Sequence, residues 1–271
     1  IIRHLRFIQT LANIIVVALE NKRLNKEYIT QIEVKKELEL AQRMQSLLFP
    51  QKLPDNEFIE VKAFYQPHSE IGGDYYDVVQ LDKNRTAFCM ADVSGKGISA
   101  ALLMANFQAN LRAQLPLTSD LKELIIACNQ KIIEAAHYEK FITLFIAIYD
   151  KKSRKLDYLN AGHQAAICVQ SGQVKLLQTG CTVLGMFDEL PTISIAQIQL
   201  NKGNKLYLYT DGLSELSNAN GEQIETDGLV ELIVDKPNIT EAIKSIQHYI
   251  KANESSEIKD DISFLAVDFH S

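Results

Sequence analysis

The first 48 residues contain neither glycine nor proline, and Pro50 ends this stretch. Those two residue types most readily interrupt a helix, so their absence lets a single helix run through the whole stretch. Apolar residues recur in it at helical spacing, among many charged residues after about residue 20. They are Leu5, Ile8, Leu11, Ala12, Ile15 and Leu19, followed by Leu24, Tyr28, Ile32, Leu38, Ala41, Met44 and Leu48. The pattern predicts one long N-terminal helix over residues 1–48.

Such a helix is charged on most of its sides and buries little surface by itself, so it needs a partner. We expect two copies of the chain to pair through it as a homodimer. Lys35 and Lys36 interrupt a strict heptad repeat, which favours a short or irregular coiled coil. The alternative is a solvated helix that packs on its own domain.

Beyond Pro50 the pattern changes to short segments rich in β-branched and aromatic residues, which are typical of strands. They cover residues 58–65, 77–81, 86–93, 141–150, 155–162, 165–170, 173–178, 193–200, 205–210 and 262–269. Helical spacing returns at 99–115 and 121–137, and again near 226–234 and 240–253. Runs of strands that follow one another predict an α+β layered domain rather than a βαβ repeat. We therefore expect a second domain over residues 49–271.

Composition narrows the class of function. The formal net charge of −6 argues against a protein that mainly binds nucleic acid, because such domains are usually basic. The longest apolar stretch near the start, residues 11–19, is about half of what a membrane-spanning helix needs. Four widely spaced cysteines, Cys89, Cys128, Cys168 and Cys181, indicate reduced thiols in a cytoplasmic protein. We see no signal peptide, and since the chain begins at Ile1 within a helical pattern, we expect it to be part of a longer protein.

Aspartates in tight glycine contexts mark the ends of several predicted strands. They are Asp74 after Gly72-Gly73, Asp92 before Val93-Ser94-Gly95, Asp211 before Gly212, and the pair Asp260-Asp261. Each alone fits an ordinary turn. Several carboxylates brought together repel one another unless a cation lies among them, and oxygen ligands without His or Cys favour Mg²⁺ or Mn²⁺.

Five motifs occur in an order that resembles a known family. They are GGDYYD at 72–77, ADVSGKGISAALLM at 91–104, NAGH at 160–163, YTDGLSE at 209–215 and DDIS at 260–263. Together they resemble the SpoIIE/RsbU group of PP2C-type (PPM) serine/threonine phosphatases, and AQRMQSLLFPQKLP at 41–54 is similar to the segment that enters that domain. The resemblance implies a sandwich of two antiparallel β-sheets flanked by helices, with a metal centre at one edge.

The resemblance also implies a role for each aspartate. Asp92 corresponds to the residue that bridges two Mn²⁺ or Mg²⁺ ions, and Val93 contributes its backbone carbonyl. Asp211 and Asp260 complete the first metal site, and Asp74 binds the second ion directly or through water. We take Asp92 and Asp211 as the catalytic residues. The ions activate water for attack on phosphorus, so no phosphorylated enzyme intermediate is required.

The implied substrate is a phosphoserine or phosphothreonine on a regulatory protein, a STAS-type anti-sigma-factor antagonist in bacterial partner switching. Residues 4–24 resemble the closing helix of a GAF sensor domain. The alternative is a catalytically silent dimeric signalling module that binds its partner through the same cleft, and the retained ligand positions argue against it. Lys96 either attracts the substrate phosphate or is a solvated turn lysine, and for His163 a structural hydrogen bond is favoured over proton donation.

Two other motif assignments are excluded by the residues that follow each motif. GGD also begins the signature of diguanylate cyclases, which continues with an acidic-aromatic pair, whereas Tyr75-Tyr76 follows here. The DVSGKG segment lacks the spacing of a Walker A loop, with Ile98 after Gly97.

Overall fold

A computed structural model of the chain describes residues 2–118, 120–218, 221–253 and 260–270. The side chains of Leu5, Ile8 and Leu11, part of the predicted apolar stripe, lie outside those described. The chain divides into two compact units, residues 1–44 and residues 45–271.

The first unit consists of helix α1, which runs from Ile2 to Ser46, so its last residues belong to the second unit. The long predicted helix is confirmed. Its described apolar side chains are largely exposed, for example Ile15 at 55%, Leu19 at 62% and Tyr28 at 62%. This exposure is what the coiled-coil prediction requires, and the pairing itself stays a prediction. None of the described helices is long and apolar enough to cross a membrane.

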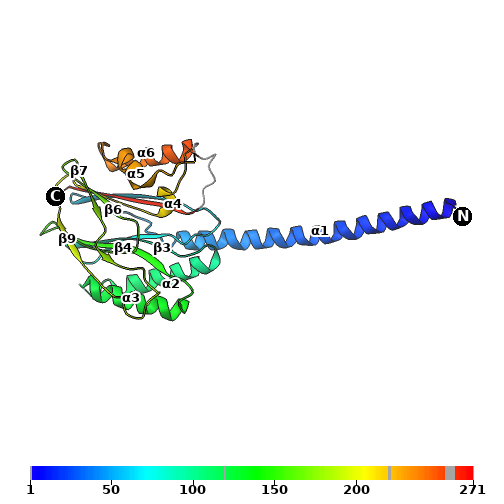
Figure 1. The fold of residues 1–271 in the computed structure, drawn as a ribbon, viewed down its shortest axis with the longest axis horizontal. Coiled ribbons are helices and arrows are strands. Elements are labelled where there is room, and N and C mark those ends of the chain that lie inside the picture. The colour runs from blue at the N-terminus through cyan, green and yellow to red at the C-terminus, as the bar shows by residue number, and fades with distance from the viewer. Residues whose placement is uncertain (1, 119, 219–220, 254–259, 271) are drawn as a thin grey trace. The chain divides into compact units, whose positions relative to one another are not determined.

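The second unit is built around two β-sheets (Figure 1). One sheet has the strand order β1-β11-β10-β6-β7 and the other β2-β3-β4-β5-β8, with β9 paired to β5. Neighbouring strands are antiparallel except for the short parallel pair β5–β8. The strands are β1 (Ile59–Gln66), β2 (Tyr75–Gln80), β3 (Arg85–Val93), β4 (Ile142–Asp150), β5 (Lys155–Ala161), β6 (Ala166–Gln170), β7 (Gln173–Leu177), β8 (Gly180–Cys181), β9 (Ala196–Gln199), β10 (Lys205–Tyr209) and β11 (Ile262–Phe269).

Helices cover the outer faces of this sandwich. Figure 1 shows α5 and α6 against the β1-β11-β10-β6-β7 sheet, and α2 and α3 against the other sheet. The helices of this unit are α2 (Ile98–Gln114), α3 (Leu121–Ala136), α4 (Asp211–Ser214), α5 (Glu225–Ile233) and α6 (Ile239–Ala252). The α+β sandwich expected from the sequence is confirmed.

Strand β10 shows why the layers form. Leu206 and Leu208 lie in the main core between the two sheets, whereas Tyr207 and Tyr209 belong to a second cluster under α5 and α6. Successive side chains of a strand point to opposite faces, so a strand apolar at every position can bury both faces. Strand β11 alternates in the same way and completes both layers.

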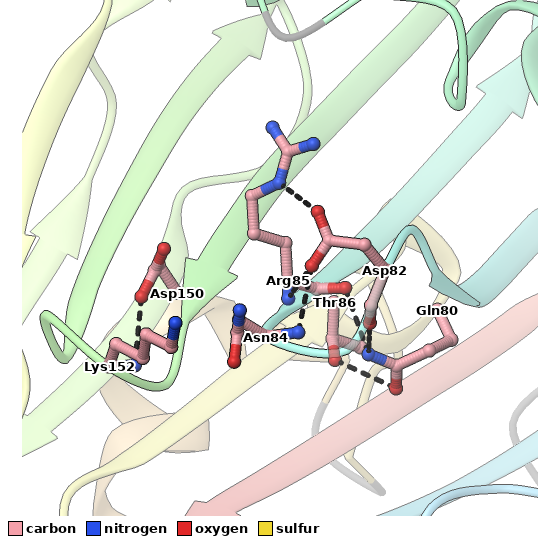
Figure 2. Close-up of polar contacts among 7 residues, drawn as sticks. All are labelled: Gln80, Asp82, Asn84, Arg85, Thr86, Asp150 and Lys152. Carbon is pink, nitrogen blue, oxygen red and sulfur yellow. Dashed lines mark hydrogen bonds and ion pairs between the residues drawn. The ribbon is translucent and has the colours of Figure 1, made fainter.

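The hairpin of β2 and β3 is closed by a turn that Asp82 holds together (Figure 2). Asp82 Oδ1 accepts the backbone N–H groups of Asn84 at 2.7 Å and Arg85 at 2.9 Å. These bonds and the Arg85 guanidinium lower the pKa of Asp82 to about 2. The turn leaves the other end of the hairpin open, where Tyr75 pairs with Ala91. Asp74, just before β2, and Asp92, near the end of β3, therefore lie at the same edge of the sheet.

Candidate metal centre

The ends of four strands bring the predicted aspartates to one edge of the sandwich. Asp74 precedes β2, and Asp92 lies near the end of β3. In the other sheet, Tyr209 of β10 pairs with Phe264 of β11. Because those two strands are antiparallel, Asp211 just after β10 and Asp260 just before β11 emerge at the same end.

Asp74 ties the two sheets together at this edge. It is 1% exposed, and its Oδ2 accepts hydrogen bonds from the Thr210 hydroxyl at 2.8 Å and the Ser263 hydroxyl at 2.6 Å. The Thr210 hydroxyl oxygen in turn accepts the backbone N–H of Ser263 at 2.9 Å. Burial first, and then the Asp92 charge, raise the pKa of Asp74, while the two hydroxyl groups oppose this change.

Burial and neighbouring carboxylates also raise the pKa values of Asp92 and Asp211. Burial and then the charges of Asp211 and Asp260 raise the pKa of Asp92 to about 8. Burial and then Asp260 also raise the pKa of Asp211. Lys96 opposes both changes. An edge of this kind retains protons or takes up a cation.

Asp260 and Asp261 have different environments although they are adjacent. The Asp260 carboxylate forms an ion pair with Lys96 at 2.8 Å and is 38% exposed. Asp261 is buried, and its two oxygens accept the backbone N–H groups of His68 at 2.8 Å and Gly73 at 2.7 Å. Asp261 therefore fixes the segment that leads to Asp74.

The donors at this edge fit a hard divalent cation, since all of them are carboxylate or carbonyl oxygens. Gly73 packs so closely that a Cβ there would come 3.0 Å from the Val93 carbonyl oxygen and 3.4 Å from Asp92 Oδ1. Among the described residues, however, no three His, Cys, Asp or Glu side chains converge tightly enough to ligate one ion as they stand.

His163 lies beside this edge and is held by hydrogen bonds. Its Nδ1 is 2.8 Å from the Thr143 hydroxyl, and its backbone N–H donates to Asn160 Oδ1 at 2.7 Å. Thr143 is in turn the cross-strand partner of Asp92. Burial lowers the pKa of His163 to about 4, so the imidazole is neutral at pH 7. The ring is hydrogen-bonded at Nδ1, whereas its buried Nε2 has no hydrogen-bond partner among the described residues, and the role of His163 stays a prediction.

The loop after Asp92 is fixed by a residue that the sequence analysis did not single out. Lys140 donates from Nζ to the Ser94 carbonyl at 2.8 Å, and the backbones of Ser94 and Phe141 are also joined. Thr210 and Ser263 were missed as well, although both lie inside the quoted motifs YTDG and DDIS. Only the structure shows that both hydroxyls point to Asp74.

Comparison with known proteins places these observations in a family. Residues 82–270 match the sequence model described as Stage II sporulation protein E (SpoIIE), a range that includes Asp92, Asp211 and Asp260 but not Asp74. The chain is 31% identical over 252 residues to phosphoserine phosphatase RsbP of Bacillus subtilis (strain 168), covering 88% of this chain and 59% of RsbP. It is 28% identical over 242 residues to phosphoserine phosphatase RsbU of the same organism, covering 88% of this chain and 71% of RsbU.

Solved structures show the same fold. The SiaA-PP2C domain of Pseudomonas aeruginosa superposes with a TM-score of 0.76 at 18% identity, covering 89% of this chain and 98% of that domain. The PP2C phosphatase domain of SpoIIE from Bacillus subtilis was solved with a fragment of its regulatory domain. It superposes with a TM-score of 0.69 at 18% identity, covering 78% of this chain and 63% of that chain. With the family match extending over more than half of its residues, this chain belongs to the SpoIIE family of PP2C-type phosphatase domains.

Proposed function

We propose that this chain is a metal-dependent protein phosphatase that hydrolyses phosphoserine or phosphothreonine on a regulatory protein in bacterial signalling. The observation that carries the proposal is the acidic edge, where burial and mutual repulsion raise the pKa values of Asp74, Asp92 and Asp211 together. RsbP and RsbU, to which the chain is similar, are named phosphoserine phosphatases.

In this proposal Asp92, the Val93 carbonyl, Asp211 and Asp260 would hold one ion, and Asp92 and Asp74 would hold the second, with Asp74 binding directly or through water. When bound, Mn²⁺ or Mg²⁺ would lower the pKa of water and offset negative charge on the phosphoryl oxygens. RsbX, a protein of the same fold, has been solved in complex with magnesium. The oxygen donors of this chain suit either ion.

The chain's own residues would prepare the site in three ways. Thr210 and Ser263 orient the Asp74 carboxylate. Lys140 holds the loop that follows Asp92. Lys96 places an ammonium group at the rim, where a phosphate dianion would meet it. A thiolate nucleophile is not needed, and burial raises the pKa of Cys89 well above that of an exposed thiol.

We extend the proposal to the substrate and the assembly. A STAS-type anti-sigma-factor antagonist is the proposed phosphoprotein, and α1 is the proposed homodimer contact because its apolar residues are exposed. The cysteines Cys89, Cys128, Cys168 and Cys181 are all free thiols, which fits a cytoplasmic protein.

Phosphate release from phosphoserine-containing STAS-type proteins, with Mn²⁺ and with a chelator, tests the proposal. We expect Mn²⁺-dependent release by the wild-type chain. Loss of an outer partner of a metal ligand commonly costs 10- to 100-fold, so Asp211→Asn, which alters a direct ligand, should reduce release by more than about 100-fold. If the folded wild-type chain binds the phosphoprotein without releasing phosphate, the silent-module alternative replaces the enzyme.

A further inference from the structure

Gln45, in the last turn of α1, makes two hydrogen bonds with one residue of the acidic edge. Its Nε2 donates to the Gly72 carbonyl at 2.7 Å, and its Oε1 accepts the Gly72 N–H at 3.1 Å. The side chain is buried, with 7% exposure. A side-chain amide that satisfies both backbone groups of one residue fixes the orientation of that residue as well as its position. Gly72 comes two residues before Asp74.

The same segment packs closely against Asp261 and Tyr65 at Gly72, and against the proposed ligands at Gly73. A Cβ at Gly72 would come 2.1 Å from Asp261 Oδ2 and 2.1 Å from the Tyr65 hydroxyl oxygen, so there is no free space around it. Gly73 meets the Val93 carbonyl and Asp92, as described above. The segment therefore contacts Gln45 through Gly72 and the proposed metal centre through Gly73. Close-packed interiors transmit small displacements, so a shift at Gln45 would reach Gly73 and Asp74.

The end of α1 is itself anchored, which keeps Gln45 in place. Phe49 is 7% exposed, and its ring centroid lies 4.9 Å from that of Tyr65 and 5.0 Å from that of Tyr76. Gln51 Nε2 donates to the carbonyls of Ser46 at 2.9 Å and Phe49 at 3.0 Å, which closes the helix end. These contacts fix the helix end, whereas the Gln45 amide bonds directly to Gly72.

We infer that Gln45 is a positioning residue for the metal centre. It holds Gly72–Asp74 so that Asp74 and the Gly73 backbone stay against Asp92 and Val93, and it acts without being a ligand. The inference rests on the proposed metal-dependent function of this edge. A merely structural contact would cost folding stability alone, whereas a positioning residue also sets the metal concentration that the site requires.

Gln45→Met tests this role because methionine preserves the length of the side chain and removes both hydrogen bonds. We expect the Mn²⁺ concentration for half-maximal phosphate release to rise about 10- to 100-fold, with a smaller effect on kcat at saturating Mn²⁺. The Mn²⁺ concentration that raises the melting temperature should shift by a similar factor. Amide exchange at Gly72, measured in the metal-free chain by NMR, should become faster.

Gln51→Met is the matched control, since Gln51 also donates two hydrogen bonds to backbone carbonyls near the same helix end but does not bond to Gly72. Because the packing of Phe49 still anchors the helix end, it should change both Mn²⁺ requirements much less than Gln45→Met does. Gln45→Asn keeps the amide but is one methylene too short to reach both backbone groups of Gly72, so it should change the Mn²⁺ requirement in the same direction as Gln45→Met. It decides the matter if Gln45→Met does not fold.

A folded Gln45→Met chain with the wild-type Mn²⁺ requirement in the melting assay would overturn the inference, as would unchanged exchange at Gly72. Neither readout needs a substrate. A wild-type chain that binds Mn²⁺ but releases no phosphate would therefore contradict the proposed function, while the melting assay would still decide on Gln45.

Discussion

Two aspartates of the β2–β3 hairpin differ in what their charge does to the stability of the fold. Asp82, in the hairpin turn, accepts backbone N–H groups, and these bonds favour its ionised form. Asp92, at the other end of the same hairpin, is buried near carboxylates, and its burial and their charges disfavour its ionised form. The two residues are the same side chain with opposite electrostatic roles. An aspartate that destabilises the ionised fold is typical of a functional site rather than of a structural one.

This contrast predicts that the contributions of Asp92 and Asp82 to the stability of the metal-free chain depend on pH in opposite directions. The pKa of Asp92 is raised from 3.8 to about 8, so the folded chain binds more protons than the unfolded chain between those values. Its contribution to stability therefore falls as pH rises from about 4 to about 8. In a chelator at pH 8, Asp92→Asn should melt at a higher temperature than the wild type, and the difference should vanish toward pH 4. Thermal melting monitored by circular dichroism measures this.

Asp82→Asn is the control, because it should change the melting temperature at pH 8 in the opposite direction. The pKa of Asp82 is lowered to about 2, so its stabilisation is present above about 4 and is lost as pH falls toward 2. At pH 8 this substitution should lower the melting temperature. A wild-type chain that is at least as stable as Asp92→Asn at pH 8 in chelator would show that the edge is not electrostatically strained.

At the scale of helices and strands, hydrophobic patterning predicted most of the second unit. The segments at 205–210 and 262–269 correspond to β10 and β11 because nearly every position is apolar and both faces are buried. The predicted strand at 193–200 is shorter in the structure, where β9 covers only Ala196–Gln199. Strand β8 has two residues and forms by pairing with β5, so no local pattern could indicate it.

The candidate site was predictable only in part, because some of its contacts depend on tertiary packing and not on local sequence. The ordered motifs predicted which aspartates come together, because strand ends meet at one edge of a sheet. The partners of those aspartates could not be predicted, since Gln45, Thr210 and Ser263 are common polar residues whose burial depends on tertiary packing. Within the quoted motif at 41–54, Gln45 and Gln51 look alike, yet only Gln45 bonds to Gly72.

Helix α2 is joined to strand β2 by an ion pair between the buried carboxylate of Asp77 and the Arg112 guanidinium, whose side chain is 43% exposed. Arg112 donates from Nε and Nη2 to Asp77 at 2.6 and 2.9 Å, and Asp77 is fully buried. Arg112→Leu leaves that carboxylate without a counterion and should lower the free energy of unfolding by about 3–5 kcal/mol in urea titrations. Lys131→Leu, which removes an exposed pair with Glu134, should cost no more than about 1 kcal/mol. Equal effects of the two substitutions would mean that the Asp77 contact does not fasten the helix.

At the scale of the whole molecule, the exposed apolar residues of α1 bear on assembly. A single helix with Ile15, Leu19 and Tyr28 exposed gains stability by burying them against another chain. We expect the 271-residue chain to dimerise and a chain that starts at Gln51 to be monomeric. Analytical ultracentrifugation at tens of micromolar measures both. A monomeric full chain under those conditions would remove the basis for the coiled coil.

The truncation also separates assembly from catalysis. A chain that starts at Gln51 lacks Gln45 as well as the helix. Its Mn²⁺ requirement should therefore be higher than that of a monomeric chain that retains Gln45. Leu19→Glu combined with Tyr28→Glu, which charges the exposed face and retains Gln45, should give a monomer with the wild-type Mn²⁺ requirement in the melting assay.

The central claim is that the four aspartates form a two-metal centre, and calorimetric titration with Mn²⁺ at pH 7.5 tests it most directly. We predict that the wild-type chain takes up two ions, that Asp92→Asn loses binding at both sites because its carboxylate is shared, and that Cys89→Ser binds like the wild type. A folded wild-type chain that takes up no Mn²⁺ at millimolar concentration, or an Asp92→Asn chain that binds two ions with unchanged affinity, would contradict the claim.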